Sequence, residues 1–68
     1  MEKLDARGLS CPEPVVMMSR AMASKAASYV MVVDNPVAKE NVTRYAMNQG
    51  YKVAVTENDG EYTLNLTK

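Results

Sequence analysis

The chain has 68 residues, and its eight basic and eight acidic side chains cancel. A chain of this length buries only a small core, so we expect a single domain over residues 1–68, and its balanced charge argues against nucleic acid as a direct partner. One cysteine and no histidine exclude a disulfide framework and the usual zinc sites, so no metal or cofactor is expected, and no apolar run approaches the ~20 residues of a membrane helix.

A short strand and an amphipathic helix open the predicted fold. The strand spans residues 2–6 with Leu4 and Ala6 facing inward, and Gly8 ends it. The helix runs from Pro12 to about residue 26, with Cys11 as its N-cap residue. Its predicted apolar side follows the helical repeat and carries Val15, Met18, Ser19, Met22, Ala23 and Ala26. Its predicted outer side carries Met17, Arg20, Ser24 and Lys25.

A second strand and a second helix follow. Residues 28–33 form an apolar, β-branched run, which is typical of a central strand buried on both faces, or nearly so. Asp34 or Asn35 then caps a helix that begins at Pro36 and runs to about Gln49, and Gly50 is expected in the left-handed conformation after it. The predicted inner side of this helix carries Val37 or Ala38, then Val42, Tyr45, Ala46 and Gln49.

The last segment predicts an antiparallel hairpin. Apolar and polar residues alternate over residues 51–56 and 62–67, and a turn sequence, residues 58–60, lies between them. The element order is therefore β-α-β-α-β-β. Two helices with one apolar stripe each and a sheet with one apolar face predict an α+β fold, a two-layer sandwich. We expect a four-stranded mixed sheet with both helices on one face and a right-handed crossover between the first two strands.

Cys11 is the residue with evident chemistry, because it stands at a strand-to-helix junction where loops present side chains to solvent. The helix dipole favours a thiolate at this end of a helix. Pro12 and Pro14 remove two of the amide donors of the first turn. Glu13 opposes the thiolate if its carboxylate turns toward the sulfur, and Arg7 favours it if it turns inward; the sequence leaves both directions open.

The residues around Cys11 limit what it can do. A disulfide oxidoreductase needs a second thiol nearby, and a cysteine hydrolase needs a base that is usually histidine; the chain has neither. Carrying sulfur as a persulfide and sensing oxidants need little beyond a thiolate in a reducing cytoplasm. The alternative is a non-catalytic regulatory or protein-interaction module whose cysteine is structural or redox-sensing.

Residues 5–14, Asp-Ala-Arg-Gly-Leu-Ser-Cys-Pro-Glu-Pro, together with the amphipathic helix that follows, closely resemble the signature of the TusA/SirA-like sulfur-carrier family. This resemblance covers essentially the whole chain and implies the same β-α-β-α-β-β fold. It implies that Cys11 receives sulfur from a cysteine desulfurase or rhodanese-like donor and passes it to a downstream acceptor protein. It also implies that Pro12 and Pro14 shape the helix start, Gly8 the loop, and Asp5 the strand-to-loop geometry.

Three further expectations concern branch, partner contacts and assembly. Residues 34–46 and 50–53 look more like the YedF-type branch, which is associated with selenium metabolism. Arg7, Glu13 and Met17 flank the cysteine and are candidates for contact with a partner protein, and Asp5 is a candidate to hold Arg7 or to cap the loop. The polar outer face of the hairpin favours a monomer.

Overall fold

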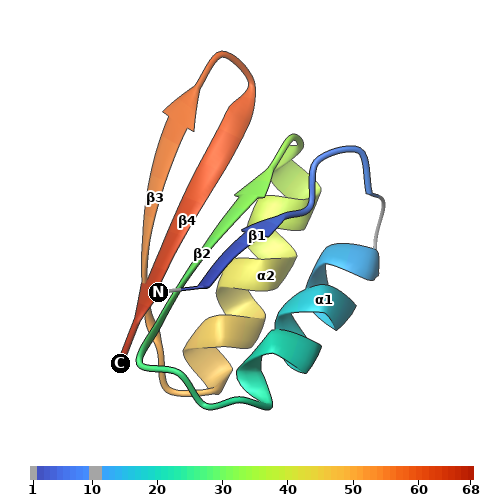
Figure 1. Cartoon of the computed structure of the whole chain (residues 1–68). Coiled ribbons are helices and arrows are strands. Elements are labelled where there is room, and N and C mark those ends of the chain that lie inside the picture. The colour runs from blue at the N-terminus through green and yellow to red at the C-terminus, as the bar shows by residue number, and fades with distance from the viewer. Residues whose placement is uncertain (1, 10–11) are drawn as a thin grey trace.

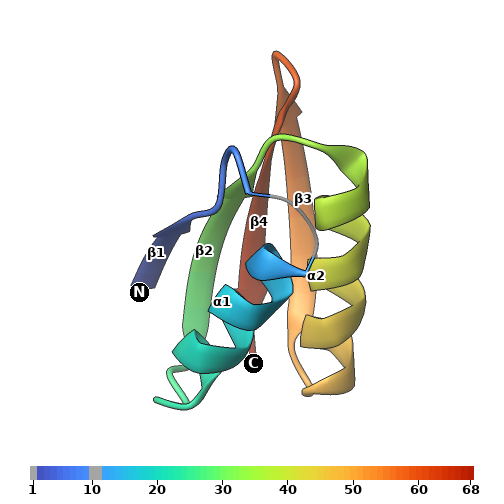
Figure 2. The same ribbon diagram turned by 90° about the vertical axis from the view of Figure 1, so that its right-hand side faces the viewer.

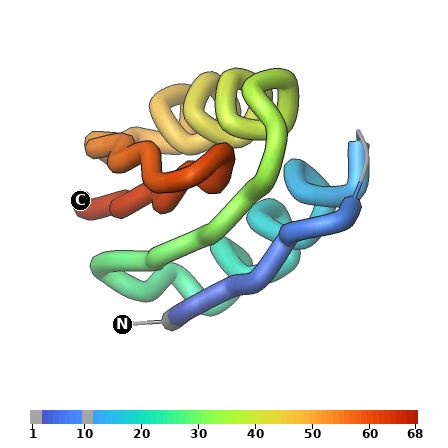
Figure 3. Tube along the Cα trace, turned by 90° about the horizontal axis from the view of Figure 1, so that it is seen from above, coloured from blue at the N-terminus to red at the C-terminus, as the bar shows by residue number. Residues whose placement is uncertain are grey.

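The computed structural model describes residues 2–9 and 12–68 and confirms the predicted element order. The elements are β1 (Glu2–Asp5), α1 (Glu13–Met22), β2 (Ser28–Val33), α2 (Pro36–Asn48), β3 (Lys52–Asn58) and β4 (Glu61–Thr67) (Figure 1). The strands form one sheet in the order β1-β2-β4-β3, in which β1 and β2 are parallel and the other pairs antiparallel. Both helices cover the same face (Figures 2 and 3), so the α+β two-layer prediction is confirmed.

Strand β2 lies between β1 and β4 and supplies the centre of the core. Tyr29, Met31 and Val33 point toward the helices and are fully buried, while the alternate residues of β2 are only half-buried. The prediction that β2 is buried on both faces, or nearly so, is therefore met in full on one face only, because within the described residues both helices lie on the same side of the sheet. Neither helix, at 10 and 13 residues, is long and apolar enough to cross a membrane.

The hairpin and α2 follow their local sequence signals closely. Asp59 and Gly60 both have positive φ, 52° and 81°, as the two-residue hairpin turn requires. The N-cap of α2 is Asn35, whose Oδ1 accepts the Ala38 N–H at 2.7 Å. Gly50, with φ of 89°, ends the helix in a Schellman arrangement: its N–H and that of the next residue bond back to the last turn.

The buried side of α2 consists of Ala38, Val42 and Ala46. Of the two residues predicted for its first inward position, Ala38 is buried and Val37 is 58% exposed. Gln49 was predicted on the inner side but is exposed, because it follows the helix as its C-cap residue.

Helix α1 starts one residue later than predicted. Its N-cap is Pro12, so the prediction that Cys11 caps it is wrong; Cys11 itself lies outside the described residues. The stripe that faces the core is shifted by about one residue: Met18 is buried and Val15 and Met22 are half-buried, as predicted, but Pro14 is also buried and Met17, predicted outside, packs against the core. Two residues predicted inside, Ser19 and Ala23, are consequently exposed.

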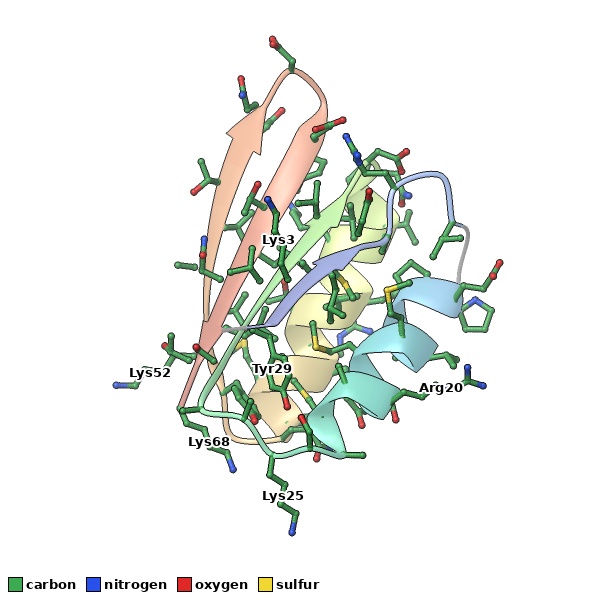
Figure 4. All side chains as sticks on the ribbon, viewed as in Figure 1. Lys3, Arg20, Lys25, Tyr29, Lys52 and Lys68 are labelled. Atoms are coloured by element: carbon green, nitrogen blue, oxygen red, sulfur yellow. The ribbon has the colours of Figure 1, made fainter. Side chains whose placement is uncertain are left out.

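Helix α1 ends at Met22, earlier than the predicted residue 26, because a tyrosine from β2 competes for its last groups. The Tyr29 hydroxyl, labelled in Figure 4, donates to Ala21 O at 2.8 Å and accepts the Ala26 N–H at 3.0 Å. The Ser24 hydroxyl also donates to Ala21 O, at 2.8 Å. The chain then turns through Lys25, which has a left-handed backbone with φ of 56°.

Replacing Lys25 with glycine is expected to raise the free energy of unfolding by about 0.5–1 kcal/mol, because glycine adopts the left-handed conformation without the steric cost that a Cβ atom carries. Urea unfolding at unchanged m-value measures the difference. Lys52→Gly is the control, since Lys52 lies in a regular strand and its replacement should lower the stability. A loss of stability in Lys25→Gly would contradict the prediction.

Candidate functional site

The loop that leads from β1 toward Cys11 is fixed by four successive backbone N–H groups, each of which donates a hydrogen bond. The bonds are Ala6 N–H to Val32 O (2.9 Å), Arg7 N–H to the Asp5 carboxylate (3.1 Å), Gly8 N–H to the Asp34 carboxylate (2.7 Å) and Leu9 N–H to Ala6 O (3.4 Å). Two of the acceptors are carboxylates, which bind amide donors more strongly than neutral oxygens do. The residues just before the cysteine segment therefore have a defined backbone path.

The Asp5 carboxylate binds the Arg7 side chain, which was one of the two roles predicted for it; the other was to cap the loop. The guanidinium donates through Nε and Nη2 to the two carboxylate oxygens, both at 2.9 Å, and its Nη1 reaches Glu61 on β4 at 3.3 Å. These bonds hold the pKa of Asp5 at about 2, below its usual 3.8, and raise the pKa of Arg7. Arg7 is thus directed toward Asp5 and the hairpin, over the sheet face that the helices leave uncovered.

The Asp5–Arg7 pair gives a defined pH dependence. Because its folded-state pKa is lowered from 3.8 to about 2, Asp5 contributes stability that is full above about pH 4 and is lost as the pH falls to about 2. We expect wild type to melt above Asp5→Asn at pH 6 and the difference between the two midpoints to become much smaller by pH 2. The Arg7 and Asp5 side chains are 50% and 60% exposed, so the difference between the two melting midpoints should be small and should shrink in 1 M salt. An unchanged difference at pH 2 would contradict the assignment.

Gly8 has a backbone conformation that favours glycine, and its N–H bonds to a residue distant in the sequence. Its φ of 78° lies in the left-handed region, which explains the choice of glycine here. Its N–H donates to Asp34 Oδ2, on the residue after β2. From the sequence, Asp34 is expected only as a candidate cap of the second helix and lies outside the predicted site. The available signal was the parallel pairing: the carboxyl ends of β1 and β2 meet at one edge, so Asp5 and Asp34 both fall there.

In the chain, the loop of residues 6–9 is followed, after residues 10 and 11, by the start of α1. Pro12 and Glu13 are exposed, while Pro14 is buried as the second helical residue. The first intrahelical bond runs from Val16 N–H to Pro12 O at 3.0 Å. The two prolines leave the first turn with N–H groups only on Glu13 and Val15 before that bond. Proline rings at these positions restrict the backbone, so the residue after Cys11 begins a stiff helix end.

A groove of about 360 Å³ runs along the outer side of α1. It is lined by Leu9, Glu13, Val16, Met17 and Arg20. Leu9 and Glu13, which stand two residues before and two after Cys11 in the chain, both line this groove. Three of its lining residues are apolar, and its two charged residues have opposite sign.

The structure brings some of the predicted site residues together and separates others. Glu13 and Met17 share this groove, and Met17 is half-buried with part of its side chain against the core. Arg7 lines a different groove, on the uncovered sheet face, together with Asp5. Within residues 2–9 and 12–68, no three acidic, histidine or cysteine side chains are grouped to hold a metal ion.

Comparisons with known proteins agree on one group. The family model described as sulfurtransferase TusA matches residues 2–68. A protein of Methanocaldococcus jannaschii that is named as a candidate sulfur carrier is 37% identical over 59 residues, or 84% of this chain and 79% of that protein. The crystal structure of a SirA-like protein from Desulfitobacterium hafniense matches with a TM-score of 0.89 at 30% identity, covering 98% of this chain and 96% of that one.

Proposed function

Because the chain belongs to the TusA family, we propose that it carries sulfur as a persulfide on Cys11. The observation that carries the proposal is the placement of the only cysteine of a TusA-family chain between a hydrogen-bonded loop and the proline-bounded start of α1. The chain has no histidine that would support acid–base chemistry at this cysteine.

The proposed transfer needs no other cofactor or oxidant. The Cys11 thiolate attacks the outer sulfur of a donor persulfide, a new S–S bond forms on Cys11, and the donor's S–S bond breaks to release its thiolate. The proton of the donor persulfide remains on the transferred sulfur or passes to solvent. The same exchange in the opposite sense delivers the sulfur to an acceptor thiolate. The oxidation state of the transferred sulfur is therefore the same on the donor, on Cys11 and on the acceptor.

The partners follow from this chemistry. The donor is a cysteine desulfurase or a rhodanese-like protein that itself carries a persulfide, and the acceptor is a downstream protein with a reactive thiol. Cys11 must stay reduced between the two transfers, which fits the cytoplasm. A single carrier domain that docks to one partner at a time works as a monomer, with Glu13 and Met17 beside the groove as candidate partner contacts.

We also propose that selenium is an alternative cargo, from the likeness of residues 34–46 and 50–53 to the YedF-type branch. The Cys11 thiolate would attack the outer selenium of a donor perselenide (R–S–Se⁻), so that an S–Se bond forms on Cys11 and the donor's S–Se bond breaks to release its thiolate. Loading with a selenium donor should give the selenium isotope pattern in the intact mass; its absence, where sulfur loads, would restrict the carrier to sulfur.

The decisive experiment is the intact mass of the native protein after incubation with polysulfide, or with a cysteine desulfurase and L-cysteine. We expect one added sulfur, about 32 Da, which a reductant removes. No addition, with the thiol shown to be free by alkylation, would contradict the proposal and favour a regulatory or interaction module. In that module a redox-sensing Cys11 would form a sulfenic acid or an intermolecular disulfide, and a structural one would react only after unfolding.

A further inference from the structure

The shortest of the four hydrogen bonds in the loop after β1 joins two segments that are distant in the sequence. Gly8 N–H donates to Asp34 Oδ2 at 2.7 Å, across 26 residues of chain. The other three amides bond within the loop or continue the pairing of β1 with β2. In Figure 1 the loop after β1 and the start of α2 both lie at the end of the sheet where β1 and β2 finish.

The Asp34 carboxylate also connects to the start of α2. Its Oδ1 accepts from Asn35 Nδ2 at 3.4 Å, and Asn35 Oδ1 in turn accepts the Ala38 N–H at 2.7 Å. One carboxylate therefore links the backbone of the loop to the N-terminus of the helix beside it. Three hydrogen bonds form this link.

The hydrogen bond to Asp34 limits the conformational freedom of Gly8. Gly8 has φ of 78°, and a Cβ built on it would meet nothing within 4 Å, so glycine is required here by the backbone conformation and not by lack of space. A glycine without such constraint visits both signs of φ. The Asp5–Arg7 pair fixes the residues before Gly8, toward the uncovered sheet face and Glu61. The bond to Asp34 ties Gly8 itself to the segment between β2 and α2.

We propose that Asp34 is a positioning residue for sulfur transfer: by accepting the Gly8 N–H it sets the path of the loop that carries Cys11 to a partner protein. This inference rests on the proposed function. Asp34 acts through the backbone and does not itself take part in the exchange. Since the role is to accept a hydrogen bond, asparagine, whose amide oxygen also accepts, should replace it, whereas alanine should not.

The test compares Asp34→Ala, Asp34→Asn and a matched control, Glu57→Ala, which removes one exposed carboxylate from β3. Each variant is loaded with sulfur from a protein donor, a cysteine desulfurase with L-cysteine, and from a small donor, polysulfide. The rate is followed by intact mass, and melting curves confirm that each variant is folded.

Asp34→Ala is expected to load from the desulfurase about 10- to 100-fold more slowly, because a docked reaction is sensitive to displacements of the order of 1 Å. Its loading from polysulfide should stay within about 2-fold of wild type, because a small donor reaches the thiol from many directions. Asp34→Asn should recover to within about 3-fold with the desulfurase, since it keeps the acceptor. Glu57→Ala should match wild type with both donors.

Wild-type rates for Asp34→Ala with the desulfurase would overturn the inference. So would equal slowing with both donors, which indicates a general effect on the thiol, or an Asp34→Asn variant as slow as Asp34→Ala, which indicates a role for the charge. If wild type takes sulfur from neither donor, the proposed function fails, and this result is distinct from the three others.

Discussion

Replacing Cys11 with serine is expected to abolish sulfur loading and to leave the fold intact. A serine hydroxyl is not ionised near neutral pH and forms no persulfide, so the intact mass should stay unchanged after incubation with polysulfide or desulfurase. The substitution exchanges a single atom, and none of the hydrogen bonds that fix residues 6–9 depends on that side chain. Circular dichroism and melting curves should overlay those of wild type.

The neighbouring serine offers a matched control for this experiment. The double variant Ser10→Cys, Cys11→Ser keeps one thiol but moves it by one residue. We expect this thiol to react with a small alkylating agent but to take sulfur from a desulfurase much more slowly than wild type, because the docked donor requires the native position. Stoichiometric, reductant-sensitive sulfur on the Cys11→Ser single variant would contradict Cys11 as the carrier.

Replacing Leu64 with alanine is expected to remove a large share of the protein's stability. Leu64 is fully buried on β4, where it is opposite Met31 of β2 and Val55 of β3. Removing a buried leucine side chain costs about 2–5 kcal/mol, through lost burial and the cavity left behind. A domain of 68 residues has a total stability of only about 3–10 kcal/mol. The substitution should therefore remove roughly half of the free energy of unfolding and shift the urea midpoint down in proportion.

Val37→Ala is the control for this substitution. It also removes an aliphatic side chain, but Val37 is 58% exposed on α2, so the loss should stay below about 0.5 kcal/mol. Urea unfolding followed by circular dichroism measures both variants. A loss below about 1 kcal/mol for Leu64→Ala would contradict the placement of Leu64 in the closely packed core.

The sequence predicts an element well where its signals are local. The turn at Asp59 and Gly60, the cap at Asn35 and the glycine that ends α2 each act within a few residues, and the structure has all three. The end of α1 depends instead on the Tyr29 hydroxyl, which comes from the next strand, donates to the carbonyl of Ala21 in the last turn and accepts the Ala26 N–H. A helical pattern that continues past that point contains no sign of this competition.

The same distinction applies to the candidate site. The glycine of the loop and the prolines that bound α1 are readable because backbone geometry restricts which residues fit there. The direction of Arg7 and the role of Asp34 are not readable, because both depend on contacts across the sheet. Asp34 bonds to Gly8 only once β1 and β2 pair in parallel with their ends aligned. Such a pair is 26 residues apart and has no local signature.

The position of β2 between β1 and β4 also determines when the newly made chain can fold on the ribosome. The pairing of β2 with β4 runs from Ser28 opposite Thr67 to Val33 opposite Tyr62, so it needs the last residues of the domain. Until Thr67 leaves the ribosomal exit tunnel, β2 can pair with β1 along one edge, but its other edge lacks its partner β4. The domain should therefore complete its sheet only after synthesis has passed β4, and nascent chains stalled before that point should be sensitive to protease.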